Sequence, residues 1–312
     1  MTTSAAGEKG AVNAPLQVYG RLETLELAPV LLAIRDHYPA GAEMHLGAIN
    51  NLVGEPSIGG TPPSGKADVA TNAETQALRY SVKNPDLRII LTITEGYYRI
   101  VARRSAGITT LADLKGKRIA SLEPTSGGYF LAKMLSQAGL TIKDVEVVNI
   151  FPIDGMPGAL ARGEVDAVSI WDPAATESAK VLNGDITEFD GKGIYRELFN
   201  LNTTEANLTD PVMRTRIVDF VRAISDAAKE IKRNPAEAQG LVVETAKLAP
   251  STVADSWGHL GFTAALPDDL LNVLVEEEKW LASQEGREPR AREDLAKLID
   301  SSVYEEAMRI ER

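Results

Sequence analysis

Residues 124–128 (PTSGG) have the types and spacing of an anion-binding helix start. They follow a predicted strand and open a predicted helix, so Thr125 or Ser126 can cap the helix while backbone N–H groups point outward. Such N–H groups, together with the helix dipole, stabilise a negative group. We therefore expect Thr125, Ser126 and Gly127 to contact an anionic ligand. The alternative is a plain helix cap without a ligand.

Three more candidates, Asp154, Trp171 and Asp172, lie at or just after the ends of predicted strands in the same half of the chain. Trp171 can cover the apolar body of a ligand, and Asp172 can accept from an amine or hold a basic neighbour. The alternative is that Trp171 packs against a hinge and that Asp172 caps the helix after Pro173. Asp154 can close a pocket or cap the helix that begins at Met156.

Arg21, after the first predicted strand, can bind a carboxylate or sulfonate through two parallel hydrogen bonds. The alternative is an exposed ion pair with Glu23 or Glu26, which would contribute little to stability. Polar and aromatic side chains at equivalent strand ends are expected to line the same wall of a binding site. These candidates are Glu23, Asn50, Asn51, Thr71, Asn72, Tyr97 and Tyr98.

Several kinds of chemistry are disfavoured by composition. The chain has no cysteine, which removes disulfides, thiolate metal sites and a cysteine nucleophile. His37, His45 and His259 show no metal-ligand spacing, so we expect no metal and no cofactor. Residues 276–278 (EEE) are interpreted as an exposed helix face. The net charge of −11, without a cluster of Lys and Arg, disfavours nucleic acid and favours a monomer.

Strand and helix patterns alternate through the first two thirds of the 312 residues. The apolar periodicity predicts strands at 16–20, 43–49, 67–71, 87–94, 98–102, 118–122, 145–150 and 166–171. It predicts helices at 24–38, 73–82, 127–138 and 156–162, and only helices after residue 210, at 211–233, 235–248, 251–257, 267–283 and 291–299. Residues 54–65, rich in Gly and Pro, form a loop. The alternation predicts an α/β fold with mostly parallel sheets flanked by helices, and this length favours two lobes.

Residues 1–15 are small and polar and lack the basic start and apolar run of a secretory signal. We expect them to form a mobile leader. The chain is then either extracytoplasmic, with a signal removed, or cytoplasmic. No run of about 18 apolar residues occurs, so no membrane span is expected.

Four stretches resemble one family of binding proteins. They are 108–120 (ITTLADLKGKRIA), 145–150 (VEVVNI), 158–168 (GALARGEVDAV) with 171–173 (WDP), and 233–238 (RNPAEA). They are similar to the substrate-binding proteins of nitrate, aliphatic sulfonate and taurine transporters. This NMT1/THI5-like group includes the pyrimidine-precursor proteins of thiamine synthesis. The resemblance extends over roughly residues 88–299.

The resemblance implies a type II periplasmic-binding-protein fold. Lobe 1 would comprise 16–101 and 203–312, lobe 2 would comprise 102–202, and crossings near Val101 and Asn202 would form the hinge. Ligands of such sheets sit beyond the carboxyl ends of the strands, where the candidate residues lie. The implied function is closure around a small anionic organic solute, such as a sulfonate or carboxylate, for ABC-type import with a permease as partner.

A cytosolic enzyme on the same scaffold is the alternative function. Resemblance to the desulfinase of thiophene desulfurisation implies a cysteine nucleophile, and resemblance to the pyrimidine-precursor synthase implies a cysteine-rich iron-binding motif. This chain contains neither, because it has no cysteine. A binding protein needs no catalytic residue, so the sequence favours a binding protein.

Overall fold

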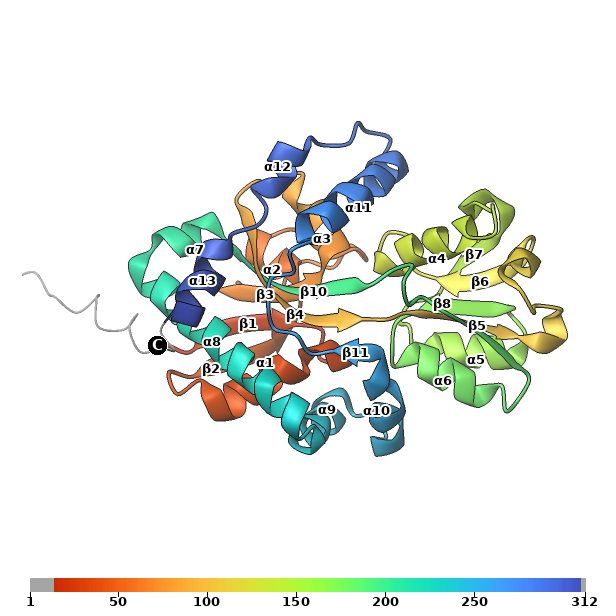
Figure 1. Ribbon diagram of the computed structural model, residues 1–312, viewed down its shortest axis with the longest axis horizontal. Helices are drawn as coiled ribbons and strands as arrows, with labels where there is room; N and C mark the ends of the chain where they lie inside the picture. The colour runs from red at the N-terminus through yellow and green to blue at the C-terminus, as the bar shows by residue number, and fades with distance from the viewer. Residues whose placement is uncertain (1–13, 310–312) are drawn as a thin grey trace, which may run out of the picture.

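Apolar runs ended by glycine or by polar residues assemble into two separate β-sheets in the computed structural model, which describes residues 14–309. The strand orders are β11-β4-β10-β3-β1-β2 and β7-β6-β8-β5-β9. The two sheets lie one after the other along the long axis of the molecule (Figure 1). Each sheet has helices on both faces, and each face has its own group of buried apolar side chains.

The six-stranded sheet forms most of the first lobe. Its strands are β1 (Leu16–Gly20), β2 (Ala42–Leu46), β3 (Val69–Ala73), β4 (Leu87–Gly96), β10 (Glu197–Thr204) and β11 (Leu260–Gly261). β1 pairs in parallel with β2 and β3, and β10 lies antiparallel between β3 and β4. β1 to β4 therefore point the same way, and their carboxyl ends meet at one edge of the sheet.

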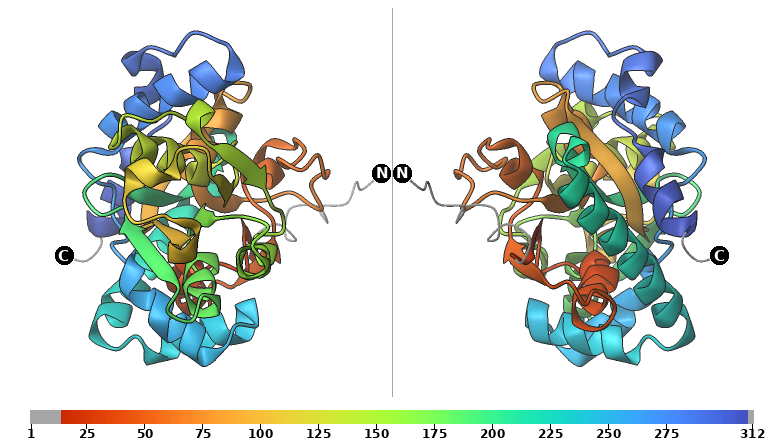
Figure 2. Two further views of the ribbon diagram at one scale, coloured as in Figure 1. Left: turned by 90° about the vertical axis from the view of Figure 1, so that its right-hand side faces the viewer. Right: turned by 90° about the vertical axis from the view of Figure 1, so that its left-hand side faces the viewer.

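The helices of the first lobe form two layers, which Figure 2 shows on opposite sides of the sheet. One layer contains η1 (Leu25–Leu27), α1 (Ala28–Leu32), η2 (Ala33–His37), α7 (Glu205–Thr209), α8 (Pro211–Arg233), α9 (Ala236–Ala246), α10 (Pro250–Ser256), η6 (Trp257–His259) and α13 (Ser301–Arg309). The other contains α2 (Ile49–Val53), α3 (Glu74–Ser81), α11 (Leu270–Glu285) and α12 (Arg292–Ala296). Their buried Leu, Ile, Val and Phe side chains supply the main folding energy, because they remove apolar surface from water.

The five-stranded sheet forms the second lobe. Its strands are β5 (Arg99–Arg103), β6 (Arg118–Ser121), β7 (Glu146–Asn149), β8 (Ala167–Ile170) and β9 (Ile186–Asp190). β6 pairs in parallel with β7 and β8, whereas β5 lies antiparallel between β8 and β9. The helical elements are η3 (Arg104–Ala106), η4 (Leu111–Leu114), α4 (Ser126–Ser136), η5 (Ile142–Asp144), α5 (Gly155–Arg162) and α6 (Ala174–Val181). α4 covers one face, and α5 and α6 cover the other.

The predicted two-lobed α/β fold class is confirmed. Most strands of each sheet point in one direction, with β10 and β11 running against it in the first sheet and β5 in the second. Residues 1–13 of the predicted mobile leader lie outside the described residues. No helix of the described part combines the length and apolarity needed to cross a membrane.

The predicted lobe boundaries differ from the sheet membership of the strands. The chain passes from one sheet to the other at residues 97–98 and returns at 191–196, whereas Val101 lies inside β5 and Asn202 inside β10. The predicted strands at 87–94 and 98–102 leave a break at 95–97, and the chain changes sheet next to that break, before Val101. On the return path, Gly191 and Gly193 mark the crossing better than Asn202 does.

Candidate functional site

The strand ends of both sheets meet where the chain crosses between the lobes. We call residues 20–26, 71–76, 95–99, 124–127, 171–172, 197 and 259 the interlobe site. One contact at the first crossing and two contacts between the lobes define it. Tyr98 Oη lies 2.9 Å from Ser126 Oγ, Gln76 Nε2 donates to the carbonyl of Pro124 at 3.1 Å, and His259 Nδ1 lies 2.9 Å from Asp172 Oδ2.

Tyr98 is the aromatic centre of this site. Its side chain is buried, and its ring lies 5.7 Å from the Trp171 ring and 5.4 Å from the Tyr195 ring, centroid to centroid. Burial, followed by the charge of nearby Glu197, raises the pKa of the Tyr98 phenol well above its usual range. Tyr98 therefore stays protonated and joins the first crossing to the start of α4.

The start of α4 has the cap that the sequence suggested. Thr125 Oγ1 accepts from the Gly127 amide at 3.1 Å and donates to the Leu122 carbonyl at 2.7 Å. The Gly128 amide also donates to Leu122, at 3.1 Å. These amides are thus engaged within the protein, as in the plain-cap alternative. Ligand contact by Thr125, Ser126 and Gly127 stays a prediction.

Glycine at position 127 lets an aromatic ring lie over the helix start. A Cβ added to Gly127 would lie 3.3 Å from Cζ3 of Trp171 and 3.2 Å from Cδ1 of Ile170. Trp171 is half-buried, packs against Tyr98 and follows β8. The predicted packing of Trp171 at the hinge is present, and cover of a ligand by its exposed part stays a prediction.

Asp172 connects the lobes as well as capping α6. Its Oδ1 accepts from the Thr176 amide at 3.0 Å and from Arg99 Nη2 at 3.1 Å, while Oδ2 faces His259 Nδ1. Burial opposes ionisation, but the hydrogen bond from His259 and the charge of Arg99 outweigh it and lower the Asp172 pKa. Asp172 is therefore a buried carboxylate that holds basic neighbours and caps a helix, as the sequence suggested.

Arg21 and Glu23 pair with one another after β1. Their side chains form an ion pair and are each 41% exposed. This is the alternative arrangement that the sequence offered for Arg21, and an exposed pair of this kind adds little stability. Both side chains remain reachable by a ligand.

Asn51 has a structural role in the first lobe. Its Oδ1 accepts from the Ala48 amide at 3.1 Å, and its Nδ2 donates to the Gly65 carbonyl at 3.1 Å. The side chain thus ties the loop at 54–65 to α2. Asn50, its neighbour on α2, is buried.

The remaining candidates divide between the site and the surface. Thr71 is fully buried, and its hydroxyl has no hydrogen-bond partner. Asn72 Oδ1 accepts from the adjacent backbone amide at 3.0 Å. Tyr97 lies at the crossing with Lys192 Nζ 5.6 Å from its ring centroid. Asp154 is exposed at the start of α5 and makes no side-chain cap, so the predicted cap is wrong.

Sequence reasoning did not select two buried acids of the interlobe site, Glu26 and Glu197. Glu26 is only 2% exposed and Glu197 only 4% exposed. Burial raises the pKa of Glu26 to about 7 and that of Glu197 well above its ordinary value. The sequence does indicate burial of Glu26, because this acid stands between Leu25 and Leu27 soon after a strand. For Glu197 the only indication is its position a few residues after Gly191 and Gly193.

A second buried acid pair, Glu74 and Glu277, lies beside the crossing. Glu74 accepts from Tyr195 Oη at 2.7 Å and from the Leu198 amide at 2.9 Å. Burial raises the pKa of both carboxyls, and the negative charge of Glu74 raises that of Glu277 further. Neither carboxyl oxygen of Glu277 has a hydrogen-bond partner among residues 14–309. Glu277 and Glu278 are buried, so the predicted exposed face at 276–278 is wrong for both.

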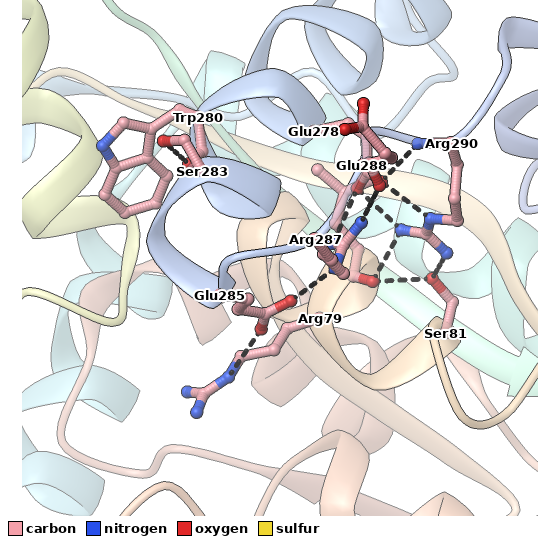
Figure 3. Close-up of polar contacts among 10 residues, drawn as sticks. Arg79, Ser81, Glu278, Trp280, Ser283, Glu285, Arg287, Glu288 and Arg290 are labelled. Carbon is pink, nitrogen blue, oxygen red and sulfur yellow. Dashed lines mark hydrogen bonds and ion pairs between the residues drawn. The ribbon is translucent and has the colours of Figure 1, made fainter.

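Glu278 is an acid with two cationic partners (Figure 3). Its Oε1 lies 2.6 Å from Arg287 Nη1 and its Oε2 lies 2.9 Å from Arg290 Nη2. Arg290 also donates to Ser81 Oγ at 2.9 Å and to the Leu78 carbonyl at 2.8 Å. Burial opposes ionisation, but the hydrogen bonds from both arginines lower the Glu278 pKa to about 2. This cluster fastens α11 and the following loop to α3.

The lobes also touch on both sides of the crossings. On one side, Lys180 Nζ of α6 lies 3.1 Å from Asp255 Oδ2 and 3.1 Å from Thr252 Oγ1 of α10. On the other, the Trp280 ring of α11 lies 5.3 Å from the Tyr129 ring of α4. Within residues 14–309, no three His, Asp or Glu side chains form a group suited to a metal ion. The geometry is that of two lobes in contact around a polar junction.

Comparison with known proteins identifies relatives of this arrangement. The family model described as NMT1/THI5 like matches residues 56–238, which is more than half of the chain. A protein of Escherichia coli (strain K12) named as aliphatic sulfonates-binding is 34% identical over 152 residues, covering 48% of this chain and 42% of that protein. The chain thus matches less than half of that relative's length.

Two solved structures share the fold along nearly the whole chain. The periplasmic aliphatic sulphonate binding protein SsuA from Escherichia coli has a TM-score of 0.71 at 17% identity and covers 92% of each chain. The desulfurization enzyme DSZB has a TM-score of 0.63 at 15% identity, covering 96% of this chain and all of that one. At these identities the likeness concerns the fold, and binders and an enzyme both use it.

Proposed function

Because the chain belongs to the NMT1/THI5-like family, we propose that it is the solute-binding protein of an ABC importer. It binds a small organic solute at the interlobe site, works outside the cytoplasm and delivers the solute to a membrane permease. The sulfonate-binding relatives support this role and make an anionic group on the solute the first choice.

The observation that carries the proposal is the construction of the junction. Within residues 14–309, only two short crossings join the sheets, and the other connections between the lobes are side-chain contacts such as His259 with Asp172. Covalent links at two adjacent crossings permit a hinge, whereas the side-chain contacts can break when the lobes part. A solute that contacts both lobes would stabilise the closed arrangement.

We propose the following residues as solute contacts from both walls. The first lobe contributes Arg21, Glu23, Asn50, Thr71, Asn72 and Tyr97, and the second lobe and crossing contribute Tyr98, Thr125, Ser126, Gly127, Trp171 and Asp172. Asn51 and Asp154 are less suited, because Asn51 has both amide atoms engaged and Asp154 is exposed at the start of α5.

Thermal-shift measurements on the full chain test this function. The panel contains sulfonates, nitrate, small aromatic acids and pyrimidines. A ligand of the folded form at one hundred times its dissociation constant stabilises it by about 2.7 kcal/mol. Small-angle scattering of the same samples should show a smaller radius of gyration with the ligand. No stabilisation by any member, or chemical turnover of a member, would contradict the proposal.

A companion variant locates the solute. Trp171→Ala should weaken binding about tenfold, because a half-buried aromatic ring supplies contact area at little entropic cost. The circular dichroism spectrum should stay that of the parent. Binding equal to the parent would place the solute elsewhere.

A further inference from the structure

Glu26 and Glu197 each carry a buried carboxyl oxygen, Oε2, that has no hydrogen-bond partner among residues 14–309. Glu26 belongs to η1, which follows the loop after β1, and Glu197 is the first residue of β10. Neither acid takes part in an ion pair with any described residue. Buried polar atoms are rarely left without partners, since burial removes their hydrogen bonds to water. We therefore expect a group from outside the chain to bind the two carboxyls.

Nearby basic side chains are already committed. Arg99, the buried arginine of the interlobe site, bonds to Asp172, to Thr176 Oγ1 at 2.7 Å and to Glu188 Oε1 at 2.6 Å. His259 faces Asp172. Basic residues of the described part of the chain thus neutralise Asp172, but none of them pairs with Glu26 or Glu197.

Two glycines leave room for unpartnered oxygens at the ends of β1 and β4. A Cβ on Gly96 would lie 2.6 Å from Glu197 Oε2, and a Cβ on Gly20 would lie 2.6 Å from Thr71 Oγ1. The Thr71 hydroxyl is fully buried and also lacks a partner. The Thr71 hydroxyl does not involve the two acids, and it is a further buried oxygen without a partner at the same edge of the sheet.

The charges around Glu26 are mostly acidic. Burial is the main cause of its raised pKa, and the charges of Asp172 and Glu23 raise it further, while the Thr24 hydroxyl lowers it. Burial and the charges of Glu26 and Glu74 raise the Glu197 pKa in the same way, and a hydrogen bond from Tyr98 lowers it. A positive group would relieve this repulsion, whereas a second anion would increase it.

We propose that the solute carries a protonated amine, and that the carboxyls of Glu26 and Glu197 bind it at the interlobe site. This inference rests on the proposed solute-binding function and names the chemistry of one end of the solute. An ammonium has three N–H donors and fits oxygen acceptors that have no other partner. Any acid group of the same solute would then lie away from these carboxyls, on the side of Arg21 or the start of α4.

Matched pairs of acids test the amine on the full chain. The pairs are 2-aminoethanesulfonate with ethanesulfonate, 3-aminopropionate with propionate, and 4-aminobutyrate with butyrate. Calorimetric titration at pH 7 should give binding of at least one amine member, about 10- to 100-fold tighter than its partner, because hydrogen bonds to charged groups are strong.

Two variants and one control assign the effect to the carboxyls. Glu26→Gln and Glu197→Gln should each remove most of the preference for the amine member. Glu43→Gln, which changes an exposed acid of β2 outside the proposed solute contacts, should retain it. Since Glu197→Gln can disturb the start of β10, the Glu26 variant carries the test if the other does not fold.

Proton release gives a readout that a merely structural role would not produce. An ammonium favours the ionised carboxylate, so binding at pH 6 should lower the Glu26 pKa and release a proton. Titrations in phosphate and in Bis-Tris, which both buffer at pH 6 and neither of which is a primary amine, should then differ in observed enthalpy. The difference should vanish in Glu26→Gln.

The outcomes separate the two proposals. Equal affinity within every pair, or binding of amine-free members alone, overturns the amine inference and leaves the solute-binding function standing. Binding of none of the six compounds also overturns the amine inference, and the wider ligand panel then decides the function by itself. An amine preference that survives both Gln substitutions overturns the assignment to Glu26 and Glu197.

Discussion

Glu26 at the lobe junction and Glu278 on α11 are both buried but have opposite environments. Glu278 lies between Arg287 and Arg290, and its pKa falls to about 2 (Figure 3). Glu26 has no cationic partner, and its pKa rises to about 7. The contrast teaches that burial alone does not assign a role to an acid. A carboxyl with partners fastens elements together, whereas one without partners is available to a ligand.

Removing the partnered carboxyl should have the largest effect on stability. Glu278→Gln leaves two guanidinium groups facing a neutral amide, which should lower the free energy of unfolding by roughly 3 kcal/mol. Because both arginines retain some contact with water, the lower end of the range for buried pairs applies. Urea denaturation measures the change. A loss below about 1 kcal/mol would mean that the cluster in Figure 3 contributes little.

Removing an unpartnered carboxyl should have the opposite sign. The folded pKa of Glu26, about 7, lies above the ordinary value of 4.5, so the folded state binds its proton more tightly than the unfolded state. Stability then falls as the pH rises from about 4.5 through 7. Glu26→Gln should remove this loss and raise stability at pH 8 by roughly 2 kcal/mol. Denaturation at pH 5 and pH 8 checks it, since equal curves for parent and variant would refute it.

The sequence predicted the fold better than the roles of single residues. Apolar runs such as those of β1 and β4 and the helix of α8 follow local periodicity, which the chain displays directly. The strands β9, β10 and β11 and the helix α13 were not predicted. β11, for example, has two residues and pairs only at the end of β4. The crossings were displaced by several residues, since tertiary pairing decides where each sheet ends.

The sequence selected several strand-end residues that the structure brings to the lobe junction, where their ligand contacts stay a prediction, but it missed the buried acids. Thr125 and Asp172 cap helices as their local sequence indicates. Glu26 and Glu197 are about 170 residues apart in the chain, and nothing local indicates that folding brings them together. Glu277 appeared to belong to a charged helix face, yet the packing of α11 against α3 and α4 buries it.

A smaller effect is expected where a partnered acid joins the two lobes. His259→Ala removes one of the basic partners of Asp172 and leaves Arg99 and the Thr176 amide in place. The loss should be about 1 kcal/mol, because the histidine is partly exposed. Scattering of the ligand-free variant should show a slightly larger radius of gyration than the parent. An unchanged radius together with unchanged stability would show that this pair does not hold the lobes together.

The smallest change in stability is expected at Arg21, whose ion pair with Glu23 is exposed, unlike the buried carboxyls. Its partner Glu23 is as exposed as Arg21 itself, so Arg21→Ala should change the free energy of unfolding by no more than about 0.5 kcal/mol. An exposed ion pair that adds no stability leaves its cation free to bind an acid group. Solute affinity is therefore the informative measurement. An affinity reduced several-fold at unchanged stability would place the acid end of the solute at Arg21. An affinity equal to that of the parent would place the acid end at the start of α4, away from the first-lobe wall.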